Sequence, residues 1–142
     1  MAVIYIVEDD KNISEIESYA LKNSGYHVDS FENAKSFWNR IQERKPDLVL
    51  LDVMLPDSDG IEVLKKMRRN PDTKRVPVIM VTAKSTEIDK VKGLDNGADD
   101  YITKPFGIME LISRVKAILR RINQDEEEKQ LVFQNITLDC EK

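Results

Sequence analysis

Acidic side chains follow two strand-like apolar runs of this chain. Glu8-Asp9-Asp10 comes directly after the first run, and the run Leu48–Asp52 ends on a carboxylate of its own. Carboxylates that converge at one edge of a sheet repel one another, and a divalent cation relieves that repulsion. Few oxygen ligands are available, so a Mg²⁺ ion that keeps several waters fits better than Ca²⁺ or a transition metal. For either acidic cluster alone, a solvated surface is the alternative.

A hydroxyl and an ammonium group follow two later strand-like runs. The first of these runs ends in Thr82-Ala83 and the second in Thr103-Lys104-Pro105. The Thr82 hydroxyl can donate to a bound oxyanion, and the small Ala83 lets a ligand approach. Lys104 is a candidate counter-ion for a phosphoryl group. Taken singly, Thr82 also fits a helix cap and Lys104 a solvated surface residue.

These residue types together predict a phosphoryl-transfer site. A carboxylate can accept phosphate covalently, and positioning with electrostatic stabilisation carries most of such a reaction. We therefore expect Asp52 to become an aspartyl phosphate, with Mg²⁺ shielding its charge. A turn or cap role is the alternative for Asp52 taken alone.

Five strand-like runs alternate with five helix-like runs, which is typical of parallel βαβ units. The predicted strands are Val3–Val7, His27–Phe31, Leu48–Asp52, Val78–Thr82 and Asp100–Thr103. The predicted helices cover about 12–23, 34–44, 61–69, 87–96 and 108–122, from apolar residues at helical spacing and from Gly and Pro stops. The apolar face of the first helix is predicted to hold Ile13, Ile16 and Ala20, and that of the fourth Ile88, Val91 and Leu94.

Right-handed crossovers turn this alternation into a doubly wound α/β fold, a five-stranded parallel sheet with helices on both faces. The flavodoxin-like order 2-1-3-4-5 needs only five strands and opens its crevice between strands one and three. This order predicts that the ends of Val3–Val7 and Leu48–Asp52 lie side by side.

The bulk composition indicates an ordinary globular chain. Of 142 residues, 41% are apolar and 34% charged, and the single Cys140 leaves no internal disulfide framework. No apolar run reaches membrane-spanning length and no signal peptide is visible, so we expect a cytoplasmic protein without a membrane partner. Residues 1–124 carry 20 basic and 20 acidic residues, which is unlike a nucleic-acid surface.

The C-terminal residues have a different character. Residues 123–129 are polar and acid-rich and are predicted to be a linker, while 130–142 resume strand-like apolar spacing but are too few for a domain. We expect either a hairpin that packs on the main body or the start of a second domain.

The motifs Glu8-Asp9, Asp52, Thr82-Ala83 and Lys104-Pro105, in this order and spacing, resemble the receiver domain of two-component response regulators, such as CheY, over residues 1–122. The resemblance implies that Asp9, Asp52 and the Met54 carbonyl hold Mg²⁺, with Glu8 in support. It implies that Asp52 takes a phosphoryl group from a sensor histidine kinase, and that Thr82 and Lys104 bind that group. It also implies a cis bond before Pro105. Such a domain is a phosphoacceptor switch rather than an enzyme, although it assists its own phosphotransfer and slow autodephosphorylation.

The stretch from Gly97 to Phe106 is similar to the OmpR/PhoB type, transcription factors with a C-terminal winged-helix DNA-binding domain. The resemblance implies that 130–142 begin that domain, through which alone DNA would be bound. It also implies a homodimer on phosphorylation through the helix4–strand5–helix5 face. The charged residues that suit this face are Lys90, Asp95, Asp99, Asp100, Glu110, Arg114, Lys116 and Arg121.

A local switch is expected from the same resemblance. The phosphoryl oxygens would draw Thr82 inward and leave space into which Tyr101 rotates, changing the dimerising face. Apolar Met54, two residues after Asp52, is expected to hinder water and lengthen the phosphorylated lifetime.

Three other functions compete with this interpretation. Aspartyl-phosphate phosphatases of the haloacid dehalogenase type carry a second Asp two residues after the nucleophile, where this chain has Met54. A flavodoxin-like flavin site conflicts with Glu8-Asp9-Asp10, which would repel a flavin phosphate. A partner-binding module with an accidental acidic cluster is the third alternative.

Overall fold

Five short strands pair in parallel in the order β2-β1-β3-β4-β5, as predicted. In the computed structural model, which describes residues 2–122, the strands are β1 (Val3–Val7), β2 (His27–Phe31), β3 (Leu48–Leu51), β4 (Val78–Thr82) and β5 (Asp100–Thr103). β3 is one residue shorter than predicted, so Asp52 lies immediately after the strand instead of at its last position. The predicted linker and second-domain segment lie outside the described residues.

The helices are α1 (Lys11–Asn23), α2 (Ala34–Glu43), α3 (Gly60–Arg69), α4 (Glu87–Asp95) and a last helix that includes residues 108–122. Each labelled helix begins at a side chain that accepts backbone N–H groups, the usual N-cap arrangement. The capping residues are Asp10, Asn33, Asp59 and Thr86. After α1 the chain turns at Gly25, whose φ of 97° favours glycine.

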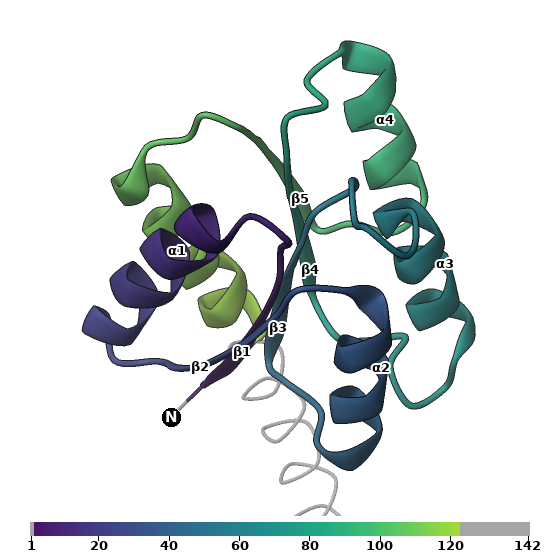
Figure 1. Cartoon of the computed structure of the whole chain (residues 1–142), viewed down its shortest axis with the longest axis horizontal. Helices are drawn as coiled ribbons and strands as arrows, with labels where there is room; N and C mark the ends of the chain where they lie inside the picture. The colour runs from purple at the N-terminus through teal and green to yellow at the C-terminus, as the bar shows by residue number, and fades with distance from the viewer. Residues whose placement is uncertain (1, 123–142) are drawn as a thin grey trace, which may run out of the picture.

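The helices cover both faces of the sheet (Figure 1). α1 and the helix over 108–122 lie on one face, and α2, α3 and α4 on the other. Alternate residues of each strand therefore enter two separate cores: Tyr5 and Leu51 pack under α2 and α3, while Ile6 and Leu50 pack under the helix over 108–122. Burial on both faces explains why the strands are nearly continuous apolar runs.

Two helices present faces that differ from the predicted ones. In α1 the buried residues are Glu17, Ala20 and Leu21, whereas Ile16, predicted to lie on the apolar face, is half exposed. In α4, Ile88, Val91 and Leu94 are exposed, and Gly93 is the buried residue. Within the described residues, no helix is both long enough and apolar enough to span a bilayer.

Candidate functional site

Asp52 is held at the carboxyl edge of the sheet by its neighbours in the chain. Its backbone N–H donates to the Val7 carbonyl oxygen at 3.1 Å, and its side chain is buried, with the residue 5% exposed. The Met54 N–H donates to Asp52 Oδ1 at 3.0 Å. The loop after Asp52 returns to it at Gly60, where a Cβ atom would overlap the Asp52 carbonyl oxygen. A glycine at the start of α3 is thus needed for this loop to close over the site.

The residues after β1 divide into two roles. Glu8 is buried and Asp9 exposed, and a carboxylate oxygen of each lies within 4.8 Å of the other and of one from Asp52. Asp10 instead caps α1, accepting from the Asn12 and Ile13 N–H groups. Three hard oxygen donors converge, and this donor set fits a Mg²⁺ ion that completes its shell with water.

Lys104 joins the two strand ends. Its ammonium donates to Asp52 Oδ2 at 2.8 Å and also to Glu8 Oε1. Its backbone N–H donates to the Thr82 carbonyl oxygen at 2.9 Å, and the following bond to Pro105 is cis. Lys104 therefore occupies the crevice between β1 and β3, where the sequence predicted a counter-ion.

Burial raises the pKa values of Glu8 and Asp52, whereas the Lys104 ammonium lowers them. Burial is the larger effect at Glu8 and raises its pKa to about 7. At Asp52 burial is opposed by the hydrogen bonds from Lys104 and the Met54 N–H, which together hold the pKa below its usual range. For Lys104, burial is outweighed by hydrogen bonds to Asp52 and Glu8, so its pKa is raised. Asp52 is thus an ionised, buried carboxylate paired with a charged lysine.

Thr82 connects this site to Tyr101. Thr82 is buried at the end of β4, beside the exposed Ala83, and its hydroxyl accepts from the Lys84 N–H at 3.4 Å. The Tyr101 hydroxyl donates to the Lys84 carbonyl oxygen at 2.7 Å, and Tyr101 is only 8% exposed. The Tyr101 ring therefore already lies inside the protein, bonded to Lys84, which is two residues after Thr82.

Glu17 is a buried carboxyl that the sequence interpretation missed. It is 1% exposed on the inner face of α1, and no donor among residues 2–122 lies within hydrogen-bonding distance of its Oε2 atom. Burial, followed by the charge of Glu8, raises its pKa to about 8. The sequence signal was a Glu on the same helix face as Ala20 and Leu21. The apolar spacing of Ile13 and Ile16 favoured a different face of the helix.

The charged residues predicted for a dimer face come from α4, from β5 and the turn before it, and from the helix over 108–122. Several of them pair within the chain: Arg114 lies 2.8 Å from Asp100 and 3.2 Å from Glu110, and Asp99 lies 3.2 Å from Arg68. Arg121 is 3.9 Å from Asp99. These pairs are mostly exposed, where ion pairs contribute little to stability.

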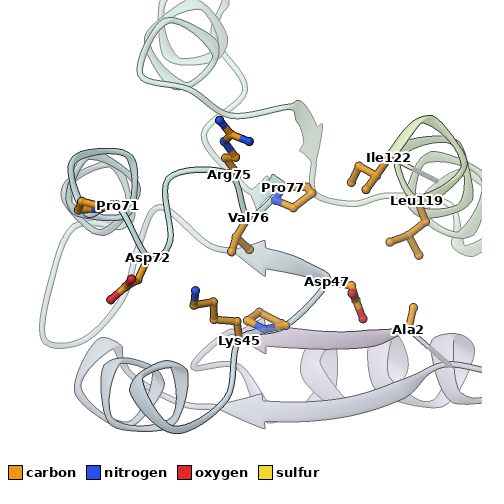
Figure 2. Close-up of a pocket in the computed structure, with 11 residues that line it drawn as sticks. Ala2, Lys45, Asp47, Pro71, Asp72, Arg75, Val76, Pro77, Leu119 and Ile122 are labelled. Atoms are coloured by element: carbon orange, nitrogen blue, oxygen red, sulfur yellow. The ribbon is translucent and has the colours of Figure 1, made fainter. Parts of the chain in front are cut away.

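A cavity of about 600 Å³ lies at the opposite edge of the sheet (Figure 2). Most of its lining precedes strands β1, β3 and β4, at the end of the sheet away from Asp52, and Leu119 and Ile122 come from the helix over 108–122. Lys45 and Arg75 are offset there by Asp47 and Asp72, so the lining favours neither sign of ligand charge. The cavity takes no part in the site at Asp52.

Comparison with known proteins decides the family. Residues 4–116 match the response regulator receiver domain. The chain belongs to the response regulator receiver domain family. The phosphate regulon transcriptional regulatory protein PhoB of Escherichia coli strain K12 is 43% identical over 136 residues, which are 96% of this chain and 59% of that protein. This receiver chain therefore spans about three fifths of the length of the curated relatives it matches.

Solved structures agree with this receiver fold. A two-component response regulator from Clostridium difficile superposes with a TM-score of 0.81 at 32% identity, covering 87% of this chain and 99% of that one. The BeF3-activated N-terminal receiver domain of RstA from Klebsiella pneumoniae gives 0.77 at 30% identity, covering 83% and 98%. The predicted family and fold are confirmed, and the haloacid dehalogenase alternative finds no support.

Proposed function

We propose that this receiver domain accepts a phosphoryl group on Asp52 from a sensor histidine kinase of a cytoplasmic two-component system. The observation that carries the proposal is the pairing of a buried, ionised Asp52 with Lys104 at the crevice between β1 and β3. A buried carboxylate held by one cation is a nucleophile that has lost most of its water. A phosphoryl group that reaches Asp52 brings oxygens to which the Lys104 ammonium can donate instead.

In the transfer step, an Asp52 carboxylate oxygen attacks the phosphorus of a phosphohistidine. The new O–P bond forms as the P–N bond breaks, and the electron pair leaves with the imidazole nitrogen. Lys104 passes from Asp52 to a phosphoryl oxygen, and the Thr82 hydroxyl turns from the Lys84 N–H to donate to another. The small Ala83 leaves room for the group.

Mg²⁺ fits the carboxylates that converge here. Asp9, Asp52 and the Met54 carbonyl would hold it, with Glu8 in support, since one ammonium does not neutralise three carboxylates. When bound, the ion supplies positive charge to the phosphoryl oxygens.

Phosphorylation is coupled to Tyr101 through the segment after β4. Because Tyr101 is bonded to the Lys84 carbonyl and Thr82 to the Lys84 N–H, a Thr82 hydroxyl that turns to the phosphoryl group acts on the same residue that holds the ring. Phosphorylation would stabilise the buried position of the Tyr101 ring. From the sequence, the ring is expected to rotate inward only after phosphorylation.

With the Tyr101 ring held in its buried position, the surface made by α4, β5 and the helix over 108–122 keeps one shape. This surface would form the homodimer. Exposed apolar residues Ile88 and Val91 lie on this surface beside the predicted charges. The similarity to PhoB supports a DNA-binding domain that follows the acidic linker, with residues 130–142 as its first part.

Labelling with [³²P]acetyl phosphate tests the acceptor. We expect Mg²⁺-dependent, base-labile label that is lost in Asp52→Asn and kept in Asp57→Asn, a matched change in the following loop. Label that persists in Asp52→Asn would refute the proposal.

A further inference from the structure

The buried position of Tyr101 depends on the absence of a side chain at Gly93. A Cβ atom built on Gly93 would lie 2.9 Å from both Cδ2 and Cε2 of the Tyr101 ring. Carbon atoms that are not bonded pack at about 3.5–4.0 Å. Even one methyl group at position 93 therefore conflicts with the ring as it lies.

The backbone gives no other reason for a glycine here. Gly93 lies within the last turn of α4, and the glycines with positive φ are Gly25 and Gly97. Glycine is the poorest helix former apart from proline. Its effect at position 93 is therefore to leave space, and the Tyr101 ring fills that space.

The ring cannot easily move away from Gly93 and stay bonded. Its hydroxyl is fixed at the Lys84 carbonyl oxygen, and a Cβ atom at Gly93 would also come within 3.8 Å of Cγ of Met80. With the hydroxyl on one side and β4 on another, the ring has only the exposed surface left to occupy.

We propose that Gly93 is a positioning residue of the switch: without a side chain it admits Tyr101 to the interior, and any larger residue holds the ring outside, detached from the Lys84 carbonyl. The consequence for signalling rests on the proposed function, but the position of the ring does not. Position 93 thus sets how readily the chain takes the arrangement that phosphorylation would stabilise.

The test measures the ring directly, in unphosphorylated protein without Mg²⁺. The four tyrosines are labelled with ¹³C in the ring, Tyr101 is assigned through Tyr101→Phe, and a soluble gadolinium chelate reports exposure by relaxation. The buried Tyr5 and the 72% exposed Tyr19 serve as internal references.

In Gly93→Ala we expect the relaxation of Tyr101 to rise severalfold, from near that of Tyr5 towards that of Tyr19. Gly107→Ala is the matched control, because the contact of its Cβ atom, at 4.0 Å from Cβ of Glu110, is an ordinary one. A Tyr101 ring as protected in Gly93→Ala as in the unmodified chain would overturn the proposal.

A thermal unfolding cycle decides the matter if Gly93→Ala is too unstable for spectroscopy. Gly93→Ala should lower the Tm of the unmodified chain but raise it in a Tyr101→Ala background, where the ring is gone and only helix propensity remains. Equal Tm changes in the two backgrounds would overturn the proposal. Since neither measurement uses a phosphoryl donor, its outcome is separate from that of the labelling experiment.

Discussion

Lys104 and Asp52 are 52 positions apart in the sequence, and their side chains meet at 2.8 Å. The pair is formed in the unphosphorylated chain, so the lysine that would bind the phosphoryl group already serves as the counter-ion of the acceptor. The site is thus arranged around one cation that the acceptor and the phosphoryl group must share.

Replacing Lys104 by Met should destabilise the chain. Two buried carboxylates, Glu8 and Asp52, would lose their cation, and loss of one partner of a buried pair costs about 3–5 kcal/mol. Urea unfolding should show this loss, and added Mg²⁺ should restore part of it. Lys84→Met, at an exposed position, is the control. Equal stabilities of the unmodified chain and Lys104→Met would contradict the pairing.

Glu17 predicts a pH dependence of stability. Its pKa is about 8 in the folded chain against an ordinary value of 4.5, so between these values the folded state holds a proton that the unfolded state has lost. The free energy of unfolding must therefore fall as the pH rises through this window. At pH 7 it should be about 3 kcal/mol lower than at a pH below 4.5, as far as Glu17 is concerned.

In Glu17→Gln the contribution of Glu17 to the slope of unfolding free energy against pH should disappear. Glu8, whose pKa is also raised, should still contribute to that slope. Urea unfolding from pH 5 to 8 measures it. Glu15→Gln, an exposed change on the same helix, should retain the original slope. If Glu17→Gln kept the full slope, the raised pKa would be wrong.

Met54 should govern the lifetime of the aspartyl phosphate. Met54 is 58% exposed two residues after Asp52, where its side chain can hinder water that approaches the phosphorus. Met54→Asn supplies an amide that can position water, so we expect the phosphorylated half-life to shorten severalfold, as followed by loss of label. Met54→Leu should keep the long half-life, and an unchanged half-life in Met54→Asn would refute the role.

Beryllofluoride with Mg²⁺ should convert the chain from monomer to dimer in light scattering, and Asp52→Ala should abolish the change. Arg114→Glu should weaken the dimer about tenfold, or 1.4 kcal/mol, by placing like charges on the proposed face. Lys35→Glu on α2, which contacts β2 at the other edge of the sheet, should have no effect. A dimer that tolerates Arg114→Glu as well as Lys35→Glu would exclude this face.

The strand ends were predictable from sequence because parallel strands buried on both faces are short apolar runs, and topology brings their ends together. Asp52 and Lys104 could therefore be assigned to one crevice without coordinates. Glu17 could not, because a shift of one residue in helical phase moves a side chain by about 100° around the axis. The buried Tyr101 depends on the space above Gly93, which only packing reveals.

The proposed switch requires Asp52 to be the phosphoryl acceptor. To identify the acceptor, the chain is phosphorylated with acetyl phosphate and Mg²⁺, reduced with borohydride, and mapped by peptide mass spectrometry. Borohydride converts an aspartyl phosphate to homoserine, so we predict homoserine at position 52. Homoserine at another position, or a phosphorylated chain with Asp52 intact, would exclude Asp52 as the acceptor.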